Sequence, residues 1–201
     1  MKRIVTAVFA LCMFAHAAYP NETFSELIFK FGVSPYSTAS YHTSINAVNV
    51  ESASKDGNAG ISLAAELYSY YGGILGFGLG LNHAFQRSIK NSDVELGFTS
   101  FYVGLKPRVV YNDGFASYMV AQIGISFPHY NHSDVLSAGN GLYCGIGAGA
   151  EISKNFVVEV LYSINRTNLK GSGYIYGAPV RLDENITYHA ININIGYRFN
   201  I

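Results

Sequence analysis

Apolar and polar residues alternate with a period of two along most of the chain after its first twenty residues. Side chains of a β-strand point alternately to its two faces, so this period predicts strands with one apolar face. The stretch 74–86 is a clear case, in which Leu75, Phe77, Leu79 and Leu81 alternate with three glycines and Asn82. Turn residues separate such stretches, and we predict eight strands, at 24–36, 59–71, 74–86, 97–110, 116–127, 141–153, 156–166 and 187–201.

Alternation is less regular in the second, fourth and seventh of these strands. In particular, Leu105, Val157 and Leu161 cannot be assigned to either face from the pattern. No stretch after the first twenty residues has about 18 consecutive apolar residues, so no membrane-spanning helix is predicted.

The connections between the predicted strands are alternately long and short. Long connections cover 37–58, 87–96, 128–140 and 167–186, and short ones cover 72–73, 111–115 and 154–155. This alternation places every long loop at one end of an up-and-down meander and both termini at the other end, as in transmembrane barrels. A β-sandwich has no reason for such an asymmetry. Lipid cannot form hydrogen bonds with the unpaired backbone groups of an open sheet edge, so the sheet must close. We therefore predict an all-β fold, an eight-stranded antiparallel up-and-down transmembrane β-barrel.

The N-terminal residues have the features of a secretion signal. Lys2 and Arg3 precede an apolar run, 4–15, and the sequence Ala15-His16-Ala17 fits the small-x-small pattern of a cleavage site. We therefore predict a cleaved signal peptide at 1–17 and a barrel domain at 18–201. The apolar run is too short to cross a bilayer as a helix, which disfavours a membrane anchor.

Composition narrows the function classes. The chain has 201 residues with 13 basic and 13 acidic side chains, so it lacks the positive excess of a nucleic-acid-binding protein. Cys12 and Cys144 are the only cysteines, which excludes a disulfide scaffold. Charged residues make up 13%, against 21 glycines, 16 tyrosines and 13 phenylalanines, a balance that indicates a surface partly hidden from water.

Eight charged residues fall on the predicted inner face of the barrel. They are four acids and four bases: Glu26, Lys30, Glu66, Lys106, Arg108, Glu151, Glu159 and Arg198. A barrel of eight strands is just wide enough for side chains to fill it, and buried charges must be paired. Equal numbers therefore predict a plugged, salt-bridged lumen, with a narrow water path as the alternative. Glycines at 76, 78, 80, 145, 147 and 149 share the inner face, where we expect them to make room for long side chains.

Two segments resemble a known family. The ending 194–201, with Asn194, Gly196, Phe199 and Ile201, is similar to the C-terminal assembly signal of bacterial outer-membrane barrels, although Phe is the commonest last residue there. The stretch 141–162 is similar to a strand-turn-strand of small OmpA/OmpX-type and opacity-type porin-family barrels. The resemblance implies the Gram-negative outer membrane, lipopolysaccharide as surrounding lipid, the barrel-assembly machinery as a partner during biogenesis, and a monomer.

Catalytic and metal-binding patterns are weak, and we expect no catalytic residue, cofactor or metal site. His42-Thr43-Ser44 has the His-x-Ser spacing of the barrels that remove acyl chains from lipid A, but it lies in a predicted loop without an orienting acid. His129, His132 and Asp134 cluster in the third loop, as solvated loop residues often do. His83 is expected at the membrane interface. No Trp is present, so Tyr71, Tyr102, Tyr162, Tyr197 and Phe199 are the candidates for the aromatic girdles.

The long loops remain as the candidates for function. Loops one and four mix tyrosines with small polar residues, a composition typical of adaptable binding loops. In related small barrels such loops bind host surfaces or resist complement. We therefore expect a structural surface protein whose loops mediate adhesion or immune interaction with a host or surface ligand. The alternatives are a narrow porin-like channel for small solutes and, more distantly, a lipid A-modifying enzyme.

Overall fold

The computed structural model describes residues 24–46, 48–90, 95–112, 114–131, 136–153, 155–175 and 178–201. The predicted signal peptide lies outside these residues. The described residues form ten strands and no helix. The strands are β1 (Phe24–Ile45), β2 (Val48–Gly57), β3 (Gly60–Tyr71), β4 (Leu75–Ser88), β5 (Glu95–Asn112), β6 (Phe115–Asn131), β7 (Leu136–Ala138), β8 (Gly141–Ile152), β9 (Phe156–Ile175) and β10 (Ala178–Asn200).

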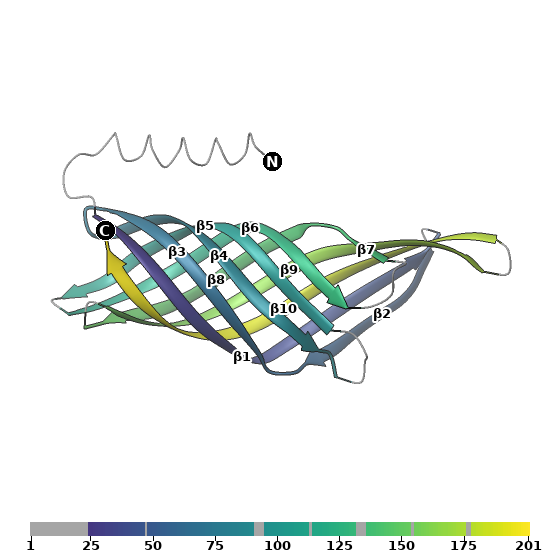
Figure 1. Cartoon of the computed structure of the whole chain (residues 1–201), viewed down its shortest axis with the longest axis horizontal. Coiled ribbons are helices and arrows are strands. Elements are labelled where there is room, and N and C mark those ends of the chain that lie inside the picture. Colours follow the sequence, from purple (N-terminus) through teal and green to yellow (C-terminus); the bar gives the residue numbers. More distant parts are fainter. Residues whose placement is uncertain are drawn as a thin grey trace.

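Eight of the strands close into a ring, which confirms the predicted fold class. Hydrogen bonding runs in the order β1, β3, β4, β5, β6, β8, β9 and β10, with every neighbouring pair antiparallel, and β10 returns to β1. In Figure 1 the ring is a barrel of tilted strands seen from the side, with the C-terminus beside the start of β1. We call that end of the barrel the terminal end and the opposite end the hairpin end. No helix in the described part of the chain is long and apolar enough to cross a bilayer.

Short turns join the strands at the terminal end, as the sequence predicts. The turn between β3 and β4 contains Gly72 and Gly73, whose φ angles of +58° and +69° lie in the left-handed region that glycine adopts without strain. The turn between β8 and β9 uses Ser153 at a φ of +53°, and its amide donates to the carbonyl of Gly114 in the neighbouring turn. The connections at this end are therefore held by backbone geometry.

The predicted long connections 37–58 and 167–186 are largely strand, so this part of the prediction is wrong. β1 continues to Ile45, turns, and comes back as β2, which pairs with β1 above the point where β3 begins. β9 and β10 likewise pair without interruption from Tyr197 to Ala178. In Figure 1 these two hairpins extend well beyond the rest of the barrel. The predicted strand ends were placed where the alternating apolar residues end. Those residues end at the membrane boundary, whereas backbone pairing between the strands continues beyond that boundary.

The outer face of the ring carries an apolar belt. On β10 the exposed large side chains are Ile191, Ile193, Ile195, Tyr197 and Phe199, which span nine positions. At about 3.3 Å per residue and a tilt of roughly 40°, this stretch covers about 23 Å along the barrel axis, close to the height of a lipid-facing band. The three unassigned residues are now placed: Leu105 faces outward, and Val157 and Leu161 are buried inside.

Candidate functional site

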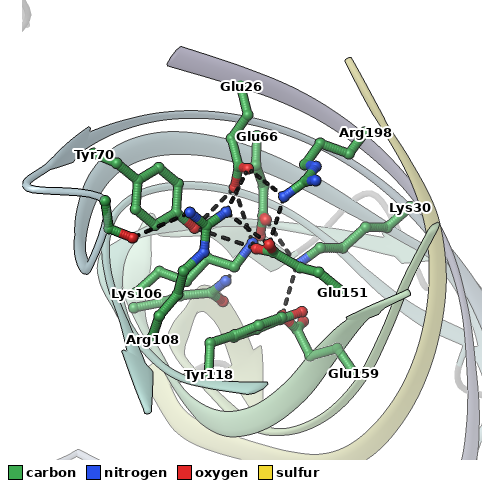
Figure 2. A network of polar contacts seen from close by, with 12 residues as sticks. Glu26, Lys30, Glu66, Tyr70, Lys106, Arg108, Tyr118, Glu151, Glu159 and Arg198 are labelled. Carbon is green, nitrogen blue, oxygen red and sulfur yellow. Dashed lines mark hydrogen bonds and ion pairs between the residues drawn. The ribbon is translucent and has the colours of Figure 1, made fainter. Parts of the chain in front are cut away.

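All eight charged residues predicted for the inner face lie inside the barrel. Each is between 0 and 7% exposed, so water has almost no access to them. Figure 2 shows their side chains converging from opposite walls of the barrel. They form two clusters, which follow one another along the barrel axis: Glu26, Lys106, Arg108, Glu151 and Arg198 in the first, and Lys30, Glu66 and Glu159 in the second.

The first cluster lies near the terminal end and holds three bases around two acids. The ammonium of Lys106 is 3.0 Å from a carboxylate oxygen of Glu26 and 3.0 Å from one of Glu151. The guanidinium groups of Arg108 and Arg198 each lie 3.3 Å from Glu26, and 2.6 Å and 2.5 Å, respectively, from Glu151. Each carboxylate therefore bridges all three bases. The cluster as a whole carries one excess positive charge.

The second cluster lies deeper in the barrel and holds one base between two acids. The ammonium of Lys30 is 2.7 Å from Glu66 and 2.8 Å from Glu159. Neutral donors complete it, since the hydroxyl of Tyr102 donates to Glu66 at 2.7 Å and the amide of Asn194 donates to Glu159 at 3.1 Å. The cluster carries one excess negative charge. The four-to-four balance of the sequence is therefore the sum of two unbalanced groups that attract each other.

Tyrosines fill the space around the charges. The hydroxyl of Tyr70 donates to Glu26 at 2.9 Å, and its ring lies 3.9 Å from the guanidinium carbon of Arg108. The hydroxyl of Tyr118 donates to Glu159 at 3.1 Å. Buried charges are tolerated when hydrogen bonds satisfy them as these do. The sequence analysis did not name these tyrosines, although their inward parity is shared with the charged residues.

The inner-face glycines provide room for these rings, as the sequence analysis expected. A Cβ atom at Gly80 would lie 2.3 Å from the Tyr102 ring, and one at Gly149 would lie 2.5 Å from the Tyr118 ring. Tyr102 is consequently buried in the lumen at 5% exposure, so its assignment to an outer girdle is wrong. It has the same parity as Lys106 on β5, and that parity places it inside.

The remaining girdle candidates do lie on the outer face. Tyr162, Tyr197 and Phe199 are more than 40% exposed, and Tyr71 is partly exposed. Phe199 packs edge-on against Phe29 at the terminal end of the barrel.

A compact apolar cluster occupies the lumen near the hairpin end. Its buried members come from four strands and the β4–β5 connection: Ala39, Ile89, Leu96, Phe98, Leu169, Ile186, Tyr188 and Ala190. Arg87 lies 5.5 Å from the Tyr188 ring, and burial lowers the pKa of its guanidinium. The sequence analysis missed this cluster because most of its members were assigned to external loops. The charged clusters and this apolar cluster thus occupy different parts of the described lumen.

Above the apolar belt, the strands form a sheet in the order β2, β1, β10, β9 and β7. Thr43 of β1 pairs with Glu51 on one side and with Glu184 on the other. Burial, and the charge of Glu51 next, raise the pKa of Glu184. Two carboxylates thus share one face of this sheet, and among the described residues no basic side chain forms an ion pair with either.

The His-x-Ser motif lies in this sheet and not in a flexible loop. The ring nitrogens of His42 are 2.7 Å from the Ser52 hydroxyl and 3.0 Å from the Asn49 side-chain oxygen. The Ser44 hydroxyl donates to the same oxygen of Asn49 at 2.9 Å. Both ring nitrogens of His42 therefore face neutral partners, and the described residues place no carboxylate in hydrogen-bonding contact with the ring.

Other histidines lie on the outer face near the hairpin end. The Thr99 hydroxyl lies between His83 and His129, at 2.8 Å and 2.6 Å from their ring nitrogens. His132 and Asp134, which were grouped with His129 in the sequence, fall outside the described residues. Within the described ranges, no group of three or more His, Cys, Asp or Glu side chains is arranged to hold a metal ion.

The C-terminal assembly residues lie on β10, at the seam where the ring closes. Asn194 and Gly196 face the lumen, whereas Phe199 and Ile201 are exposed at 45% and 70%. The amide of Ile201 donates to the carbonyl of Ser25 on β1, so the last residue joins the first strand of the ring. Their role in assembly stays a prediction.

Comparison with known proteins agrees with this geometry. The family model described as outer membrane protein beta-barrel domain matches residues 4–199. No curated protein sequence matches the chain. The crystal structure of the outer membrane protein OprG from Pseudomonas aeruginosa is similar with a TM-score of 0.54 at 12% identity, over 88% of this chain and 95% of that one. The outer membrane protein AlkL in lipid bilayers gives a TM-score of 0.56 at 10% identity, over 91% and 92%. At these identities the likeness concerns the fold.

Proposed function

The chain belongs to the outer membrane protein beta-barrel domain family, and from this premise we propose that it is a non-conducting, non-enzymatic surface protein that acts through its protruding sheet. Its location is the outer membrane. Barrels of this class expose short turns to the periplasm and long connections to the outside, so we assign the terminal end to the periplasm and the hairpin end to the cell exterior.

The burial of the side chains inside the barrel is the observation that carries the proposal. Eight charges are paired at 0 to 7% exposure, and an apolar cluster follows them toward the exterior. A conducting pore needs a continuous path of water. Ion pairs that are hidden from water, and an apolar cluster nearer the exterior, leave no favourable place for water along such a path. The narrow-channel alternative requires both layers to open.

The protruding sheet supports a role in surface contact. From Ser37 to Ile45, β1 extends nine residues beyond the belt. At about 3.3 Å per residue and a tilt of roughly 40°, the sheet rises about 23 Å above the membrane. A paired sheet is a more rigid platform than loops, and it presents its polar side chains in fixed positions. This favours a surface contact such as adhesion or an interaction with a host.

The neutral surroundings of His42 support the non-enzymatic part of the proposal. A hydrolytic histidine needs an acid that orients it and stabilises its protonated form. The partners of His42 are a serine hydroxyl and an asparagine side chain. We therefore assign His42 to the stabilisation of the β1–β2 hairpin.

Single-channel recording of the refolded chain 18–201 in a planar bilayer tests the proposal. We expect a folded barrel that gives no discrete openings. Arg108→Ala removes a base at the periplasmic end and Glu66→Ala removes an acid from the middle of the lumen. Both variants should also be silent, because the apolar cluster remains. Reproducible openings of the wild-type barrel would overturn the proposal, and conductance that appears only in the variants would favour a gated narrow channel.

A further inference from the structure

We propose that Arg87 holds a carboxylate ligand with an apolar tail at the hairpin end of the lumen. This inference goes beyond the proposed surface role and does not depend on it. It rests on the backbone irregularity that turns this arginine into the barrel, on two buried donors that lie close together there, and on the apolar side chains around them.

A β-bulge in β4 directs Arg87 into the lumen. Ala84 of β4 pairs with Phe98 of β5 and Arg87 pairs with Leu96, so two residues of β4 lie opposite a single residue of β5. Without the extra residue, regular alternation would turn Arg87 toward the lipid, as it turns Phe85, which is 38% exposed. A bulge is a means of redirecting a side chain. This one places a cation inside the barrel at 5% exposure.

Arg87 adds a positive charge to a lumen whose other charges are paired with one another. Those pairs join the eight residues of the two clusters, and none of them includes Arg87. Its Nη1 atom is buried and has no hydrogen-bond partner in the described part of the chain. The described acid nearest to it in the sequence is Glu95, which lies on the outer face of β5 because its neighbour Leu96 faces the lumen. A buried cation of this kind calls for an anion.

A second buried donor lies beside the guanidinium. The guanidinium carbon of Arg87 is 5.5 Å from the centre of the Tyr188 ring. Tyr188 is 2% exposed, and among the described residues its hydroxyl proton has no acceptor. A carboxylate has two oxygens that accept hydrogen bonds, and it matches the planar fork of a guanidinium. One carboxylate can therefore serve both donors.

The surroundings of Arg87 favour an apolar tail on the ligand. Tyr188 and Ile89 belong to the apolar cluster at the hairpin end. On another side the guanidinium lies over Gly60, where a Cβ atom would overlap the guanidinium carbon. Gly60 and Ala84 share the lumen face beside Arg87, and both are small and partly exposed, which leaves room next to the charge. One cation among apolar side chains suits an aliphatic carboxylate better than a strongly hydrated inorganic anion.

Titration calorimetry with hexanoate tests the proposal, on the refolded chain 18–201 in lipid nanodiscs with empty nanodiscs as the blank. We expect saturable binding of one hexanoate per barrel. Hexanol keeps the tail without the charge, and acetate keeps the charge without the tail. Each should bind at least roughly tenfold more weakly. The absence of saturable hexanoate binding, or equal affinity for either comparison compound, would overturn the proposal.

Arg87→Met tests the unpaired charge directly, because it removes the cation and keeps an apolar side chain of similar length. Without ligand the variant should unfold at a higher urea concentration than the wild type in lipid vesicles, and it should no longer bind hexanoate. A lower urea midpoint would show that the cation has a partner within the chain, contrary to the proposal. Arg166→Met, at an exposed arginine of β9, is the matched control and should bind hexanoate normally.

Asp93→Asn tests for a counter-ion within the chain. Asp93 is the acid nearest to Arg87 in the sequence and lies outside the described residues. We expect the variant to bind hexanoate with unchanged affinity. Tighter binding would mean that Asp93 competes for Arg87, and the proposal would then be wrong. A barrel that gives no single-channel openings and binds no hexanoate would refute this inference alone and leave the proposed surface role in place.

Discussion

The ammonium of Lys106 lies 4.1 Å from the centre of the Tyr118 ring, and the hydroxyl of that ring donates to Glu159. One tyrosine therefore joins the positive cluster near the terminal end to the negative cluster deeper in the barrel. The ring face attracts the cation and the hydroxyl satisfies the acid. The two clusters thus act as one unit that crosses the barrel.

Tyr118→Phe should separate the two contributions of this side chain. The variant keeps the ring over Lys106 and removes the donor to Glu159, and a hydrogen bond to a charged group contributes about 1.5–3 kcal/mol. We expect a loss of about that size in the free energy of unfolding, measured by urea titration in lipid vesicles. Tyr118→Leu also removes the ring and should cost more. Equal losses in the two variants would show that the ring face does not stabilise Lys106.

Neutralising the two clusters should have unequal effects. Glu26→Gln leaves three bases with one acid in the first cluster, whereas Glu66→Gln leaves one base with one acid in the second. Removing one partner of a buried pair typically costs about 3–5 kcal/mol. We expect Glu26→Gln to lie in this range and Glu66→Gln to cost clearly less, in the same urea titration. The reverse order would contradict the division into two clusters of opposite net charge.

Phe199 and Ile201 should be needed for assembly. Both face outward at the closing seam of the ring. Replacing both with Asp should block insertion, because the side chains of an assembly signal and of the lipid belt must be apolar there. Surface labelling of cells that express the variant measures the outcome, and Ser117→Asp in β6 is a control for a general effect of added charge. Surface levels equal to wild type would refute the assembly role.

The outer sheet should be more stable in acid because of Glu184. Its pKa is raised above the usual 4.5 by burial, and next by Glu51. The folded sheet therefore binds this proton more tightly than the unfolded chain does. The stabilisation is fully present below about pH 4.5 and is lost as the pH rises through the raised value.

Hydrogen exchange of the β10 amides, measured at matched pH, tests whether protonation of Glu184 stabilises or destabilises the sheet. Glu184→Gln should increase protection at pH 7 and change it little below pH 4.5. Asp183→Asn, one residue away and on the opposite strand face, is the matched control. A decrease of protection in Glu184→Gln at pH 7 would show that the carboxylate stabilises the sheet.

Much of the fold and of the inner charge set follows from the sequence. Period-two alternation predicts which side chains face inward, and all eight charged residues lie where parity places them, from Glu26 on β1 to Arg198 on β10. The face to which a side chain points depends only on its odd or even position along the strand. This property is local, so it can be predicted from a single sequence. Tyr102 was misplaced because its residue type was weighed above its parity.

Pairing and strand length required the tertiary structure. Whether Lys30 meets Glu66 or another acid depends on barrel tilt and stagger, and these are set by closure of the whole ring. The extension of β1 to Ile45 and of β9 to Ile175 depends on hydrogen bonding to neighbouring strands once the apolar signal has ended. The sequence by itself determined the faces of the strands, since lipid and lumen impose opposite polarity on alternate residues. Only the tertiary structure decided the partners, because partners in a closed sheet are distant in the chain.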